Sequence, residues 1–159
     1  FRDVNSGIIF QTTFAKDVSE NVMDKADAIL AHENEMQRVL QALPATFGNA
    51  LIYLMEWADI SVETLAEKAL ISPKMVQRMR NDPSYPKNID SVVAICIGMN
   101  LPPELSNALI SRSGYNLRLA QNEAHLMYNF FLNHLYMGSI HECNDMLVAK
   151  SLPVMTGTE

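Results

Sequence analysis

Few side chains of this sequence could bind a metal ion or act as a nucleophile. Its imidazoles and thiols are those of His32, His125, His134, His141, Cys96 and Cys143. His141-Glu142 begins like the His-Glu-x-x-His zinc motif, but Asp145 stands where the second histidine is required. We therefore expect no metal site. Two cysteines are too few for a disulfide framework, so we expect both to be small core residues of a cytoplasmic protein.

Catalytic motifs are equally scarce. The sequence contains no Gly-rich phosphate loop and no Gly-x-Ser-x-Gly nucleophile motif, and nothing in it places a serine beside a histidine. We expect no catalytic residue, no cofactor and no enzyme activity in this chain. No apolar run approaches the roughly 18 residues that a membrane-spanning helix needs, so we expect no membrane partner.

Long hydrogen-bonding side chains recur in the middle of the sequence. Lys74 and Arg78 are four residues apart, and four residues turn a helix by about 400°, so both should project from one exposed helix face. Residues 44–117 hold six Lys or Arg and seven Asp or Glu, and four of the six cations lie between Lys74 and Lys87. This spacing predicts a local positive face on a nearly neutral body.

The whole chain has 159 residues, of which 48% are hydrophobic and 19% charged, with a net charge of -6. This composition is sufficient for a core and excludes both a disordered chain and a polycationic DNA-coating protein. The first residues lack an initiator Met and a signal-peptide pattern, so we expect a piece of a longer protein or a processed one.

The N-terminal 44 residues predict two elements. Alternating residues Ile8, Phe10, Thr12 and Phe14 indicate a short strand at 8–14, which would need a partner from a second chain or from missing upstream sequence, or would be an extended arm over the helices. Apolar residues at spacings of three and four predict a long amphipathic helix over 19–43, which Pro44 ends.

The remainder of the chain predicts seven helices. Five short ones occupy 45–117, with Ser61, Ser72 and Asn88 as N-caps, Pro73 at a first helical position and Gly114 at a C-terminus. A sixth spans 122–137 and ends at Gly138, and a Ser139-x-x-Glu142 capping box starts the last, which reaches about Lys150. The predicted fold class is therefore all-α apart from the strand.

Residues 45–117 resemble the lambda-repressor-like (Xre) helix-turn-helix family. The likeness is carried by the Leu65-Ala66 pair, the Ile71-Ser72 turn, Val76 and Met79 three apart, and the segments 86–92 and 99–101. Leu70 replaces the usual turn glycine, Val62 replaces a frequent glutamine, and Arg80-Asn81-Asp82 replaces an acidic-x-Gly ending. The resemblance implies a five-helix module in which helix 72–81 enters the major groove of DNA.

This resemblance also implies roles for individual side chains. Lys74 and Arg78 fall at base-reading positions, with Gln77 nearby, and these side chains suit guanine and adenine edges. Pro73 falls at a reading position with only an apolar ring. The positions expected to hold phosphates are Ser61, Thr64, Arg80, Asn81 and Lys87.

The resulting expectation is a sequence-specific DNA-binding transcriptional regulator that acts as a homodimer on double-stranded DNA. Residues 1–44 would form a linker or dimerisation arm, 45–117 the DNA-binding domain and 118–159 a helical extension. A protein partner could instead dock on 19–43 or 126–136. The altered turn and weak charge favour the alternative, a repressor-fold interaction module, antitoxin- or scaffold-like or the appendage of a larger protein, that binds no DNA.

Overall fold

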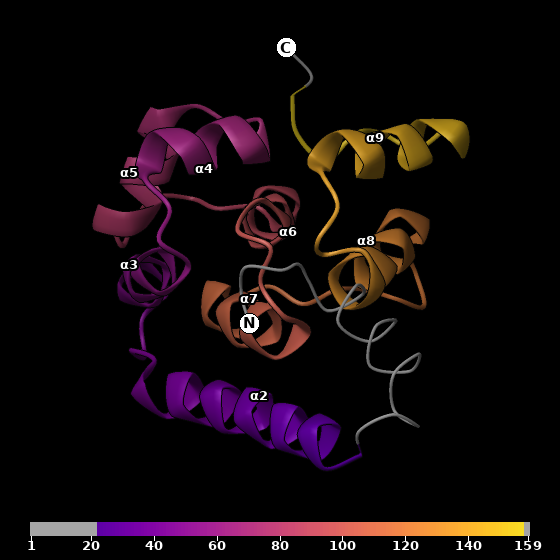
Figure 1. Ribbon diagram of the computed structural model, residues 1–159. Coiled ribbons are helices and arrows are strands. Elements are labelled where there is room, and N and C mark those ends of the chain that lie inside the picture. The colour runs from indigo at the N-terminus through magenta and orange to yellow at the C-terminus, as the bar shows by residue number, and fades with distance from the viewer. Residues whose placement is uncertain (1–21, 158–159) are drawn as a thin grey trace.

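The computed structural model describes residues 22–157, and in this part of the chain it contains eight α-helices and no strand (Figure 1). The helices are α2 (Val22–Ala42), α3 (Phe47–Ala58), α4 (Val62–Ala69), α5 (Pro73–Asn81), α6 (Ile89–Gly98), α7 (Pro103–Ser113), α8 (Glu123–His134) and α9 (Ile140–Ala149). The predicted all-α class is confirmed for these residues. The strand predicted at 8–14 lies outside them.

Helix α6 is the centre of the molecule, and Figure 1 shows it nearly end-on with the other helices around it. It contacts α4, α7, α8 and α9, and every residue from Ser91 to Gly98 is buried. Its sequence is almost entirely apolar, as expected of a helix that is covered on all sides. The C-terminal helices α8 and α9 therefore share one core with the central segment.

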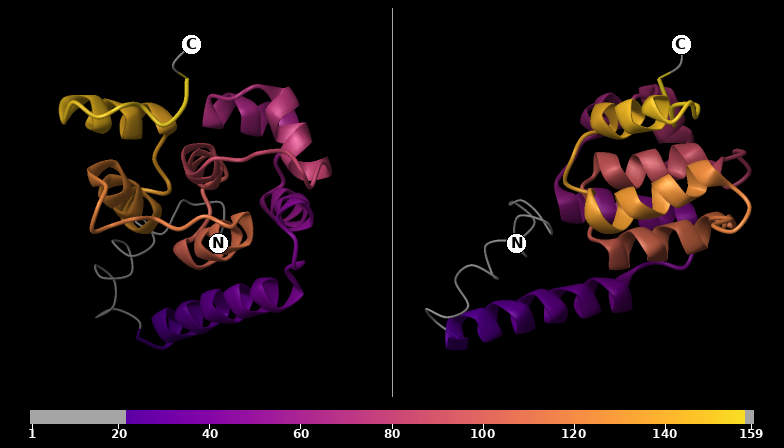
Figure 2. Two further views of the ribbon diagram at one scale, coloured as in Figure 1. Left: turned by 180° about the vertical axis from the view of Figure 1, so that it is seen from behind. Right: turned by 90° about the vertical axis from the view of Figure 1, so that its right-hand side faces the viewer.

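Helix α2 differs along its length. Met36 and Val39 in its second half are buried, and so is Leu43, which follows the helix. Its first half extends past the other helices (Figure 2), with Val22 66% and Leu30 60% exposed. Between Val22 and Gly157, no helix combines the length and apolar character needed to cross a bilayer.

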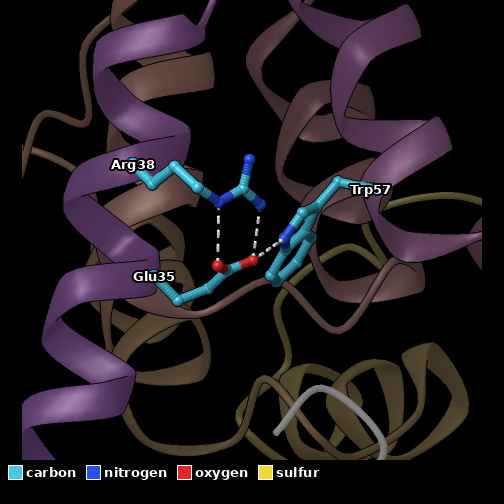
Figure 3. Close-up of polar contacts among 3 residues, drawn as sticks. All are labelled: Glu35, Arg38 and Trp57. Atoms are coloured by element: carbon cyan, nitrogen blue, oxygen red, sulfur yellow. Dashed lines mark hydrogen bonds and ion pairs between the residues drawn. The ribbon is translucent and has the colours of Figure 1, made fainter.

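A polar cluster attaches α2 to α3 (Figure 3). The Glu35 carboxylate accepts hydrogen bonds from Arg38 Nε at 3.0 Å and Nη2 at 2.7 Å, and from Trp57 Nε1 at 2.7 Å. The bonds from Arg38 and then from Trp57 lower the pKa of Glu35 from 4.5 to about 2. Trp57 lies on α3, so this carboxylate joins two helices that the Pro44 segment separates.

The predicted helix starts are confirmed by their caps. The side-chain oxygens of Ser61, Ser72 and Asn88 each accept a hydrogen bond from the backbone N–H three residues later, and Pro73 opens α5. Ser139 and Glu142 form the predicted capping box at the start of α9. These short polar residues satisfy N–H groups that the first helical turn leaves without partners.

The prediction that α8 continues to Met137 and ends at Gly138 is wrong, because the helix stops at His134. The chain turns there and buries Tyr136. Asn100, which has a left-handed backbone, donates its side-chain amide to the carbonyls of Tyr136 at 2.8 Å and Gly138 at 3.5 Å. This contact from a distant loop fixes the chain reversal, and helical periodicity carries no signal for it.

The C-terminal tail returns from α9 to the end of α4. Asn144 on α9 accepts a hydrogen bond from the backbone N–H of Met155 at 3.0 Å and donates one to the carbonyl of Thr156 at 3.2 Å. The Thr156 hydroxyl then donates to the carbonyl of Ala69 at 2.6 Å. The tail therefore supplies a partner for a backbone carbonyl at the C-terminus of α4.

Candidate nucleic-acid interface

Helix α5 has one buried face and one face of long polar side chains. Val76 and Met79 are buried in the core, where α5 contacts α3 and α4. Lys74, Gln77 and Arg78 are exposed, and the spacing of three and four places them on one face. The predicted base-reading residues therefore lie together in solvent.

The turn between α4 and α5 spans only residues 70–72. Leu70 adopts a left-handed backbone with φ 57°, and its N–H and that of Ile71 bond to the last turn of α4. A non-glycine residue in this conformation costs about 1–2 kcal/mol. Gly157 in the tail lies against Leu70, since a Cβ added to Gly157 would stand 3.1 Å from Leu70 Cδ1. The tail thus packs against the turn between α4 and α5.

A glycine on α3 sets the close approach of the C-terminal end of α5. A Cβ at Gly48 would lie 2.5 Å from the carbonyl oxygen of Arg80. Because that neighbour is backbone, any larger side chain would have to displace α5 or α3. Gly48 therefore fixes how deeply α5 sits on the core, although it lies 32 positions before Arg80 in the sequence.

Arg78 is held by the loop that follows α5. Its Nη2 lies 3.6 Å from Asp82 Oδ2, and its guanidinium carbon lies 4.5 Å from the centre of the Tyr85 ring. Asp82 Oδ1 accepts bonds from the backbone N–H and the hydroxyl of Ser84, at 3.0 and 2.8 Å. The bonds from Ser84 and the neighbouring Arg78 lower the pKa of the Asp82 carboxyl. Asp82 is therefore a negative charge fixed beside Arg78.

Three of the predicted phosphate-binding residues are exposed near helix ends. Ser61 caps α4, and its Oγ lies 3.0 Å from the hydroxyl of Thr64 in the first turn. Asn81 ends α5, and its amide donates to Gln77 Oε1 at 3.3 Å. These groups sit at the two helices joined by the short turn, on exposed surface.

The other two predicted phosphate-binding residues, Arg80 and Lys87, are half-buried. Arg80 is two positions from Arg78 and so points to a different side of α5, where its Nε is buried without a hydrogen-bond partner among the described residues. Lys87 Nζ lies 5.1 Å from the centre of the Phe47 ring and bonds to the carbonyl of Tyr85 at 3.5 Å. Arg80 therefore does not share the face of Lys74 and Arg78, and Lys87 is engaged by Phe47 and Tyr85.

The residues weighed for metal chemistry lie elsewhere. Cys96 and Cys143 are buried, as predicted, and burial raises the pKa of each thiol to about 12. Within residues 22–157, one group of metal-binding donors comes together, with ligand atoms within 4.8 Å of one another: His32, Glu33 and Glu104. Glu33 is exposed and the other two are half-buried, an arrangement that surface carboxylates commonly show without an ion.

Sequence reasoning missed the residues that position the candidate interface. Gly48, Asp82 and Tyr85 act through contacts of α3 and of the loop after α5, and Thr156 acts from the C-terminal tail. Only Asp82 had a local signal, because Asp-Pro-Ser is a sequence that favours a turn closed by the aspartate side chain.

Compared with known proteins, the chain matches no family model, no curated protein and no solved structure.

Proposed function

We propose that this chain is a sequence-specific DNA-binding transcriptional regulator that reads the major groove with helix 72–81. The observation that carries the proposal is the exposed row of Lys74, Gln77 and Arg78 on a helix anchored through its opposite face. The short turn after α4 and the caps at Ser61 and Ser72 support a helix-turn-helix module of the lambda-repressor-like kind.

The chemistry of this row suits base edges. A Lys or Arg side chain can donate to guanine O6 and N7, and a Gln side chain can pair with adenine. The exposed hydroxyls of Ser61 and Thr64 at the N-terminus of α4 would meet the phosphate backbone, where helix N-termini favour negative charge. The half-buried Arg80 and Lys87 contribute positive potential at the edge of this surface.

A homodimer would supply the affinity that one module lacks. Few cations lie on the surface proposed to face DNA, and a single module with few phosphate contacts binds weakly. The exposed apolar side chains outside the module are candidates for the dimer contact, among them Val22, Met23 and Leu30 on α2 and Leu126 and Phe130 on α8. Phe131 is fully buried and Leu135 is half-buried. Within the segment 126–136, expected to dock a protein partner, the exposed Leu126 and Phe130 are therefore the candidates for this contact.

Selection of binding sites from random DNA, followed by a salt series, tests the proposal. On the selected site, Arg78→Ala should cost about 1–3 kcal/mol and relax the preference at one base pair. On random DNA it should cost little. Lys150→Ala, which removes an exposed cation after α9, is the matched control and should change neither affinity.

Lys87→Ala separates base reading from general attraction. If Lys87 adds only positive potential, its loss should weaken binding to selected and random DNA about equally. If selection enriches no sequence and binding stays weak at low salt, the DNA-binding proposal fails.

The interaction-module alternative rests on the exposed apolar surface of α2. Val22, Met23 and Leu30 are each at least 60% exposed on a helix half that extends from the body. Such a face suits a helical partner or a second protein domain. This alternative predicts that Leu30→Glu abolishes partner binding and that Lys74→Ala and Arg78→Ala do not affect it.

A further inference from the structure

Asp82 and Tyr85 form a clamp around Arg78, and within residues 22–157 neither Lys74 nor Gln77 has an equivalent one. The guanidinium is flanked by the Asp82 carboxylate at 3.6 Å and the Tyr85 ring at 4.5 Å. Lys74 and Gln77 make no ion pair or ring contact with the described residues, although Gln77 accepts a hydrogen bond from Asn81. The clamp therefore distinguishes one side chain of the row.

We propose, building on the DNA-binding function, that Asp82 and Tyr85 are positioning residues that orient Arg78 to read a guanine. An arginine side chain loses considerable rotamer freedom when it forms a specific contact. Holding it in place beforehand reduces that loss at the moment of binding. A guanidinium has five N–H donors, so a contact from Nη2 to Asp82 leaves donors for guanine O6 and N7.

The clamp is itself fixed by the loop. Ser84 holds Asp82 Oδ1 through two hydrogen bonds, which leaves Oδ2 toward Arg78. The backbone N–H of Tyr85 bonds to the carbonyl of Asp82 at 3.0 Å, and the Tyr85 ring packs against the core. An unpaired carboxylate beside DNA would repel phosphates. The position of Asp82 is therefore explained if its carboxylate pairs with Arg78 and orients it.

The test compares Asp82→Asn with Glu63→Gln, which removes an exposed carboxylate from α4. Both variants lose one negative charge, so both should bind random DNA somewhat more tightly. Only Asp82→Asn should reduce the ratio of selected-site to random-DNA affinity, by about tenfold, through loss of preference at the guanine that Arg78 reads. The same base-pair preference should disappear in Arg78→Ala, and the double variant should show no additional loss.

Tyr85→Phe keeps the ring and should behave as wild type, whereas Tyr85→Leu should weaken the same preference. Circular dichroism and thermal unfolding identify variants that fail to fold, and Asp82→Asn remains informative because its side chain is similar in size. If wild type selects a site and Asp82→Asn keeps the wild-type ratio, the clamp proposal is overturned and the DNA-binding proposal stands. If wild type selects no site, it is the DNA-binding proposal that fails.

Discussion

Helices α5 and α6 follow each other in the chain and have nine and ten residues, but they meet solvent in opposite ways. Helix α6 buries every residue from Ser91 to Gly98, whereas α5 buries only Val76 and Met79. Helix α6 therefore serves the packing of the core. Helix α5 is held by the buried Val76 and Met79 and by the close backbone contact at Gly48, and its polar face points outward. A helix can thus be positioned firmly while most of its side chains stay available for a partner.

The largest expected effect on stability comes from a substitution that would create a cavity beside α6. Ile95 is fully buried, so Ile95→Ala should lower the free energy of unfolding by about 2–5 kcal/mol, measured by urea denaturation. Gln77→Ala on the exposed face of α5 is the control and should stay within about 0.5 kcal/mol of wild type. Equal losses in the free energy of unfolding for Ile95→Ala and Gln77→Ala would contradict the distinction between a buried α6 and an exposed face of α5.

Gly48→Ala tests the backbone contact that seats α5. In an open helix position this change would stabilise the protein by about 1 kcal/mol. Here the new methyl group meets the carbonyl of Arg80 at 2.5 Å, so we expect a loss of about 1–3 kcal/mol in thermal or urea unfolding. Asn49→Ala, at the exposed next position, should not destabilise. A stabilised Gly48→Ala protein would show that α5 is not fixed by this contact.

Unfolding measured over a pH series extends the comparison to α2, which is joined to α3 partly through the carboxylate of Glu35. The pKa of Glu35 is about 2 in the folded protein and near 4.5 as a free side chain, so its contribution is present above about pH 4.5 and is lost as the pH falls toward 2. The group is partly exposed, so we expect Glu35→Gln to cost about 1 kcal/mol at neutral pH. The difference from wild type should vanish in acid. A constant difference across the series would exclude the ionised carboxylate as its cause.

The smallest expected effect is on the stability of Arg78→Ala. The ion pair with Asp82 is half-exposed, so unfolding in urea should change by less than about 0.5 kcal/mol. The same variant should lose binding to a selected DNA site, which is the contrast that a reading residue should show. A stability loss above about 1 kcal/mol would mean that Arg78 mainly holds the loop after α5.

Local chemistry explains why most helix starts were predictable. Ser61, Ser72, Asn88 and Ser139 each satisfy an N–H within three residues of themselves, so their role is visible in a short stretch of sequence. The end of α8 was not predictable, because the turn after it is held by Asn100, which bonds to the carbonyl of Tyr136 from 36 residues away.

The candidate interface shows the same division. The shared face of Lys74 and Arg78 follows from helical spacing alone. Two other features depend on how α3 packs against the rest of the core. They are the half-burial of Lys87 against Phe47 and the close approach of α5 to Gly48. Contacts between distant segments leave no periodic pattern, so sequence spacing could place the polar row but not its surroundings.

The hydrogen bond from Thr156 to the carbonyl of Ala69 has a consequence for the order of folding. It joins residues 87 positions apart, at the turn that leads into α5. Contacts of such long sequence separation form late, because closing a long loop costs entropy before the contact repays it. During synthesis, α4 and α5 leave the ribosome well before Thr156 does, so the turn between them acquires this partner only when Thr156 arrives. The polar face of α5 therefore reaches its final setting only after Thr156 has been synthesised, well after its own residues were made.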